Sequence, residues 1–241
     1  MVRGTASAAL RRMRPEERQS PPLILRALRG YRGVRTVPTD EGELRLESWF
    51  EDVRSQTRPP FGRRGDSYPT ISGTFVHEFP MTLETREGVR TLAVLTRAVF
   101  SLRPDQGQIL FFGPTATADF FASQVGNATV RDPRSWGYMG LGPQQLFTIR
   151  QRASNVRGVG YQRNPDAYVH KMSYTGTNVD QNAEVRRADR AAELYRVMIE
   201  FVLSNGKRTI QLMQSGNMLG YGASPVDFED LADVIHAIAP G

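Results

Sequence analysis

The sequence predicts an α+β domain, mainly an antiparallel sheet built from hairpins with helices packed on one face, plus an extended basic N-terminal arm. Two stretches, 91–126 and 194–239, share the order strand, turn, strand, helix, which favours hairpins over parallel crossovers. Apolar residues are dense from Ile71 onward and sparse before Asp66. The basic charge is concentrated in the segment that is poor in apolar residues. This difference in composition between the two segments predicts the arm.

Composition limits the class of protein. The 241 residues are 39% apolar and 23% charged, enough for one large domain, or one domain plus an extension. There is no cysteine, so disulfides, zinc–thiolate sites and thiol nucleophiles are excluded. No run reaches the roughly 18–20 apolar residues of a membrane helix, and the first residues lack the apolar stretch of a secretory signal. We expect a cytoplasmic protein with no membrane partner.

Charge is the most informative bulk property. The chain carries a net +6, and residues 1–35 hold nine arginines and two glutamates, a net +7. The remaining 206 residues therefore sum to −1, so the basicity belongs to the N-terminal segment. Only Lys171 and Lys207 are lysines, and arginine suits bidentate contacts with phosphate or carboxylate.

The expected organisation has three parts: a basic arm (1–35), a linker with a short helix (36–66) and the α+β domain (67–241). A short apolar stretch around Leu25 gives the arm one or two helical turns that could dock. The linker helix is predicted from Leu44, Leu46, Trp49, Phe50 and Val53.

The first half of the domain predicts strands over 71–76, 81–86, 91–102 and 109–112, with Pro80 separating the first two. The run 91–102 is apolar enough to be a central strand covered on both faces, and a helix of that length stays open. A helix over 115–124 follows.

In the second half, residues 127–143 are typical of a loop and 144–152 of a short helix. Two strands are predicted within 156–175, and a helix over 180–193.

Asn205-Gly206 between two apolar runs then predicts a hairpin in which Phe201 faces Ile210 and Ile199 faces Leu212. An extension of the preceding helix through Val202 is the alternative. An amphipathic helix over 227–238 ends the chain.

The arm's arginines are candidates for salt-sensitive contacts with nucleic-acid phosphates. The same charge would suit an acidic protein surface, or serve only as a solvated tail. The predicted nucleic-acid-binding residues are Arg11, Arg12, Arg14, Arg18, Arg29, Arg32, Arg63, Arg64, Trp136 and Tyr138. The two aromatics belong to a glycine-rich loop that could stack on a base, or whose rings cap the core.

Catalytic motifs are absent. No phosphate loop, nucleophile elbow or closely spaced histidine pair occurs, so no catalytic residue, metal ligand or cofactor is predicted. Asp166, His170 and Lys171 resemble the acid-plus-lysine chemistry of metal-dependent nucleases, but the second carboxylate expected before the lysine is missing.

The leading hypothesis is therefore a nucleic-acid-associated binding or accessory protein (DNA or RNA) without its own catalytic activity. The alternative is a structural or assembly subunit with a docking arm, as a homo-oligomer or in a larger complex. A metal-dependent nuclease-like enzyme is the third reading.

Overall fold

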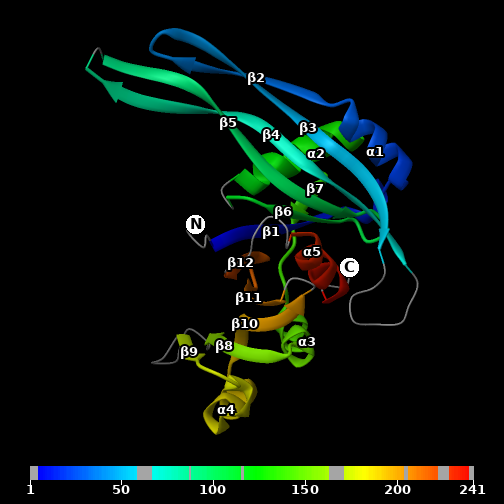
Figure 1. The fold of residues 1–241 in the computed structure, drawn as a ribbon, viewed down its shortest axis with the longest axis vertical. Helices are drawn as coiled ribbons and strands as arrows, with labels where there is room; N and C mark the ends of the chain where they lie inside the picture. The colour runs from blue at the N-terminus through cyan, green and yellow to red at the C-terminus, as the bar shows by residue number, and fades with distance from the viewer. Residues whose placement is uncertain are drawn as a thin grey trace.

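One large antiparallel sheet organises the molecule. The computed structural model describes residues 5–58, 67–86, 88–114, 117–162, 171–203, 206–221 and 228–238. The strands follow the order β2-β3-β4-β5-β6-β1-β12-β11-β10-β8-β9, with β7 pairing β1, and every recorded pair is antiparallel (Figure 1). The predicted α+β class with a mainly antiparallel sheet is confirmed.

The first half of the sheet is made of long hairpin strands. They are β2 (Arg32–Thr39), β3 (Gly42–Arg58), β4 (Tyr68–Thr85), β5 (Gly88–Arg103) and β6 (Gln108–Phe112). The strands predicted over 91–102 and 109–112 are therefore confirmed. Burial of β5 is limited to its last third, however, so it is not covered on both faces throughout. Pro80 does not separate two strands, because β4 runs through it.

The second half contains β8 (Asn155–Gln162), β9 (Lys171–Thr175), β10 (Glu193–Leu203), β11 (Gly206–Met213) and β12 (Asn217–Tyr221). The β10–β11 hairpin is confirmed, but its register is displaced by two residues: Ile199 faces Ile210 and Phe201 faces Arg208. Because the shift is even, the predicted buried side chains keep their face. Asn205 itself lies outside the described residues.

Strand β1 (Thr5–Met13) joins the two halves, pairing β6 on one side and β12 on the other. This corrects the expectation of an extended arm for the described part of residues 1–35. The physical reason is the run of small and apolar residues that precedes Arg11: Ala9 faces one core and Leu10 the other, both fully buried. The 3-10 turn η1 (Pro15–Glu17) and helix α1 (Pro21–Arg29) follow.

Helices cover both faces of the sheet, which corrects the prediction of helices on one face. On the α1–α2 face, α1 and α2 (Ala118–Val130) pack on a core that includes Phe75, Phe100 and Phe111. On the α3–α5 face, α3 (Pro143–Arg152), α4 (Ala183–Ala191) and α5 (Phe228–Ile238) pack on a core that includes Leu110 and Val197. Helices are needed on both faces because every residue of β6 is buried, whichever face its side chain is on.

Residues 44–53 form part of β3 and not the predicted linker helix. Leu46, Ser48 and Phe50, spaced by two residues, are buried on the face toward α2, and β3 pairs with β2 and β4 on its two sides. Pairing with neighbouring strands therefore determines the conformation of this segment, although its apolar residues also have helical spacing.

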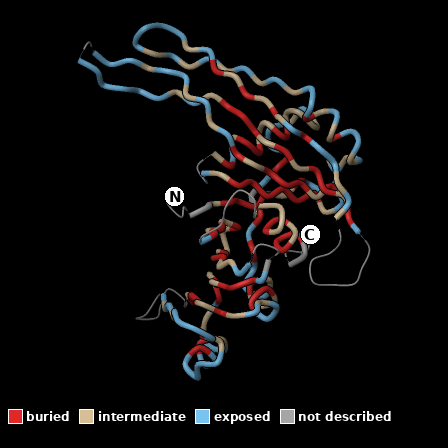
Figure 2. Tube along the Cα trace, in the orientation of Figure 1, coloured by how far each residue is buried: buried red, intermediate tan, exposed pale blue. Residues whose placement is uncertain are grey.

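The β2–β3 and β4–β5 hairpins extend beyond the helices (Figure 1). Pairing between β3 and β4 begins at Ser48 and His77, and β5 meets β6 only from Val99. Beyond these points lies the β4–β5 arm, residues 78–98, and Figure 2 shows that this end of the hairpin is largely exposed.

Candidate functional site

A cleft of about 770 Å³ separates α5 from strands β3, β4 and β5. Its apolar wall includes Val99, Phe112 and Phe228, and its polar side carries threonine, serine and charged side chains.

A β-bulge in β3 determines which side chains line this cleft. The β3–β4 register shifts between Glu51 and Arg54, where Asp52 adopts a left-handed φ of 52°. Before the bulge, even-numbered residues such as Phe50 face α2; after it, Val53 faces α2. Arg54 and Arg58 consequently point toward α5, since a strand alternates its faces.

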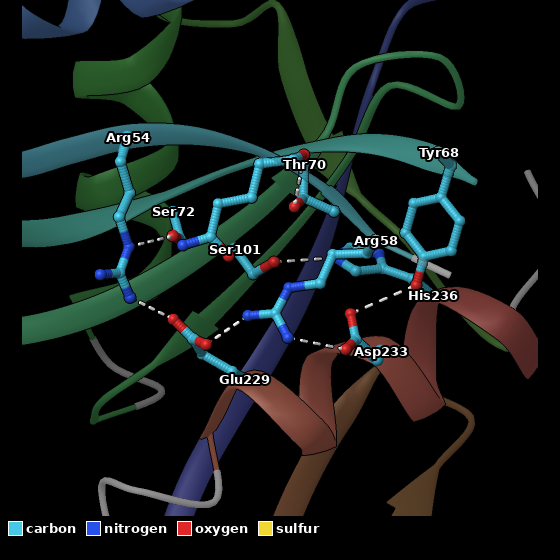
Figure 3. A network of polar contacts seen from close by, with 10 residues as sticks. Arg54, Arg58, Tyr68, Thr70, Ser72, Ser101, Glu229, Asp233 and His236 are labelled. Carbon is cyan, nitrogen blue, oxygen red and sulfur yellow. Dashed lines mark hydrogen bonds and ion pairs between the residues drawn. The ribbon is translucent and has the colours of Figure 1, made fainter. Parts of the chain in front are cut away.

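Figure 3 shows that these arginines connect β3 to α5. Glu229 accepts hydrogen bonds from both Arg54 and Arg58, and Arg58 Nη1 also lies 3.1 Å from Asp233 Oδ2. Glu229 and Asp233 are four residues apart and therefore share one face of the helix. The network fixes the last helix against the long hairpins.

The charges of this network shift the pKa values of its members. Burial opposes the ionisation of Glu229, but hydrogen bonds and charge from Arg58 and Arg54 outweigh it and lower its pKa. Asp233 is more buried and its pKa is raised, chiefly by desolvation. Tyr68 donates to Asp233 across 3.3 Å, and burial together with that carboxylate raises the pKa of Tyr68 to about 12.

His236 lies under the cleft between two neutral partners. Its Nε2 atom is 3.2 Å from Ser101 Oγ and its Nδ1 atom is 3.3 Å from Gln108 Oε1. Complete burial, reinforced by the charge of Arg103, lowers the pKa of His236 to about 3. A serine, histidine and amide in line resemble a nucleophile and base, but so weak a base does not accept the serine proton near neutral pH. The arrangement fixes the neutral imidazole in the wall.

An apolar wall with hydroxyl groups along one side suits a small organic molecule or a side chain of a partner. The described residues contain no cluster of three or more histidine, aspartate or glutamate side chains positioned to hold a metal.

The β4–β5 arm is a second candidate site. Of the ten large apolar side chains that are exposed in the described part of the chain, six belong to this hairpin. They are Phe79, Met81, Leu83, Val89, Leu92 and Leu95. This concentration is unusual, because single exposed apolar residues are normally scattered over a surface.

Two of the predicted nucleic-acid contacts are buried. Arg11 is 2% exposed and its guanidinium is hydrogen-bonded to Asp119. Trp136 is 5% exposed in strand β7 (Trp136–Tyr138), where its ring belongs to the core under α2. Neither side chain offers a surface for phosphate or base. The side chain of Tyr138 lies outside the described residues.

Other predicted residues are more accessible. Arg14, Arg18, Arg29 and Arg32 are exposed, and Arg12 is half-buried. Arg14 lies 3.9 Å from Glu17, Arg29 donates to the carbonyl of Val53, and Arg32 stacks over Trp49. Arg63, Arg64, Asp166 and His170 lie outside the described residues. Lys171 stands over the ring of Tyr195 in β10.

Sequence reasoning did not select Arg54, Arg58, Glu229 or Asp233. The spacing of each pair was a usable signal, since residues four apart share a face in a helix and also in a strand. Nothing in the sequence joined the two pairs, which are more than 170 residues apart.

No helix among the described residues has the length and apolar character needed to cross a lipid bilayer. No protein-family model matches the sequence, and no curated protein is significantly similar to it.

Proposed function

We propose that the protein is a non-catalytic binding subunit that engages a protein partner through the β4–β5 arm. The observation that carries the proposal is the exposed apolar surface of this hairpin, with Phe79 50% and Leu92 49% exposed. Contiguous apolar surface of this kind marks sites of protein interaction.

Pairing within the hairpin brings Phe79, Met81, Leu83 and Leu92 together on one face, while Val89 and Leu95 lie on the other. Met81 faces Leu92 and Phe79 faces Val94, so both pairs lie on the face that α1 and α2 cover nearer the core. Covering the exposed half of each large side chain would contribute about 1 kcal/mol. A two-stranded ribbon is marginally stable alone in water, so a partner would also stabilise the arm.

The proposal is tested by placing a photo-crosslinking amino acid at Leu83 in cells that naturally produce the protein. The matched control is Val202, which is 57% exposed but lies on β10, away from the arm. A discrete adduct from position 83 and none from position 202 is expected. Identical products from the two positions would contradict a binding role for the arm.

Nucleic-acid binding is the second candidate, favoured by three exposed arginines, Arg26, Arg29 and Arg32, at the end of α1 and the start of β2. Deleting residues 1–35 would remove the central strand β1, so point variants are the better test. Labelled DNA and RNA should be titrated at two salt concentrations against a variant with alanine at these three positions.

The control variant carries alanine at Arg186, Arg187 and Arg190, three exposed arginines on α4. Loss of affinity and a shallower salt dependence in the first variant alone would support phosphate binding. Equal affinities for all three proteins would end this candidate.

A further inference from the structure

We propose that the open edge of β5 pairs with the same edge of a second copy of the chain, forming an antiparallel homodimer. This deepens the proposed function, on which it rests, by naming the partner. Along β5, β4 pairs one side from Gly88 to Leu102, but β6 pairs the other side only from Val99 to Arg103. Among the described residues no strand pairs this side of residues 91–98, which therefore form a long sheet edge.

The other edges of the sheet carry features that discourage strand pairing. Strand β2 contains Pro38, and β9 is five residues long and begins with Lys171. The free edge of β4 contains Glu78 and Pro80. Natural sheets use proline, charge and short edges to prevent association. Residues 88–98 of β5 contain no proline or acidic residue, and their two charged residues, Arg90 and Arg97, lie on either side of the apolar stretch from Leu92 to Leu95. This uncharged centre indicates an edge kept open for pairing.

The hydrogen-bonding groups of the edge can be assigned from the β4–β5 register. Thr85 and Gly88 close the hairpin, and pairs alternate along it between bonded and non-bonded types. Pro80, which has no N–H, faces Ala93 and falls at a non-bonded position. The N–H and C=O of Ala93 consequently point outward, away from β4, as do those of Thr91 and Leu95.

The edge is complementary to itself. A two-fold axis at Ala93 would make this residue face its own copy and would bring Thr91 opposite Leu95, all with outward backbone groups. Leu92 would face Val94, an apolar pair on one face of the extended sheet. Arg90 would face Thr96 and Arg97 would face Val89, so the like charges of the two copies are not opposed.

A second copy fits better than an unrelated strand, because both faces of this edge are apolar at the centre. Leu95 is 43% exposed on one face and Leu92 is 49% exposed on the other. A pairing strand must therefore be apolar on both of its faces, which is uncommon outside buried strands. Residues 92–95 of this chain meet that requirement, and a two-fold arrangement closes without further growth.

The test is sedimentation velocity and native mass spectrometry of the full chain over a wide concentration range. The wild type is expected to dimerise. Ala93→Pro should raise the dissociation constant of the dimer by about tenfold or more, since two N–H···O bonds across the axis are lost. The proline removes no bond to β4, because that N–H points outward. Ala93→Thr retains the N–H and should dimerise like the wild type, and circular dichroism checks that both variants fold.

A wild type that stays monomeric, or an Ala93→Pro variant that dimerises as well as the wild type, would overturn the homodimer. If the chain is monomeric while the crosslinker at Leu83 captures a different protein, the homodimer fails and the binding function stands. If neither a dimer nor an adduct forms, both proposals fail.

Discussion

Arg11 Nη2 lies 2.7 Å from Asp119 Oδ1, but the two side chains differ greatly in exposure, at 3% for the arginine and 80% for the aspartate. The arginine belongs to the central strand β1 and the aspartate to the first turn of α2. An arginine that its sequence context assigns to phosphate binding is therefore a structural cation, and its carboxylate comes from 108 residues away.

This asymmetry predicts unequal effects of removing each partner. Asp119→Ala leaves a buried guanidinium without its carboxylate and should lower the free energy of unfolding by about 2–3 kcal/mol. Arg11→Met should cost less, because the exposed Asp119 is rehydrated once the arginine is gone. Urea unfolding of both variants checks the order, and a larger loss in Arg11→Met would refute this account.

The sequence identified the elements that depend on local signals. The β10–β11 hairpin and the helix ending near Ile238 are encoded by apolar periodicity, so their existence was predictable. The hairpin's register was not predictable. Moving the turn by one residue shifts the strand pairing by two residues, and an even shift leaves every side chain on the same face. The apolar pattern therefore does not distinguish the two registers.

The site was less predictable because it depends on a bulge and on distant pairing. A period-two extrapolation from Phe50 places Arg54 against α2, and only the extra residue near Asp52 turns it toward α5. Likewise, the arginines near the N-terminus dominate the charge count and conceal that Ala8, Ala9 and Leu10 are suited to a buried strand. Local charge cannot report a partner that the fold supplies from elsewhere.

The buried His236 predicts a loss of stability in mild acid. Its pKa is about 3 in the folded protein and 6.5 in an exposed chain, so between these values the unfolded state binds the extra proton. Stability therefore rises with pH across this window, by up to about 1.4 kcal/mol per pH unit from this group.

His236→Gln can fill the same place without titrating. Urea unfolding from pH 7 to pH 4 should show a steeper decline for the wild type than for this variant. Parallel curves would mean that the imidazole is protonated, or accessible to water, in the folded state.

The link between β3 and α5 predicts a small, salt-sensitive contribution from Glu229. Glu229→Gln should cost about 0.5–1 kcal/mol at low salt and less at high salt, since the carboxylate is 38% exposed and partly screened. Glu43→Gln, an exposed position at the far end of β3, is the control.

The pKa of Glu229 is lowered from its ordinary 4.5, so its contribution is present above that pH and disappears as the pH falls through the folded value. The difference between wild type and Glu229→Gln should therefore shrink in acid. A difference that grows below pH 4.5 would show that the carboxylate is not stabilised by Arg54 and Arg58.

Only glycine is expected to fit at position 216, in the turn that supports β1. Its φ is +72°, and a Cβ there would lie 2.1 Å from the carbonyl oxygen of Met139. Its own carbonyl accepts a hydrogen bond from Leu10 N at 3.1 Å. Gly216→Ala must therefore displace backbone next to the central strand, and we expect a loss of about 2–4 kcal/mol.

Gly137 is the matched control, because no atom lies within 4 Å of a Cβ placed there. Gly137→Ala should leave stability nearly unchanged. Hydrogen exchange gives the local readout: the amide of Leu10 should exchange faster in Gly216→Ala than the loss of global stability explains, while amides of the β10–β11 hairpin should accelerate only as much as global unfolding does. Equal stability of the two variants would show that the turn can relax, and that β1 does not depend on it.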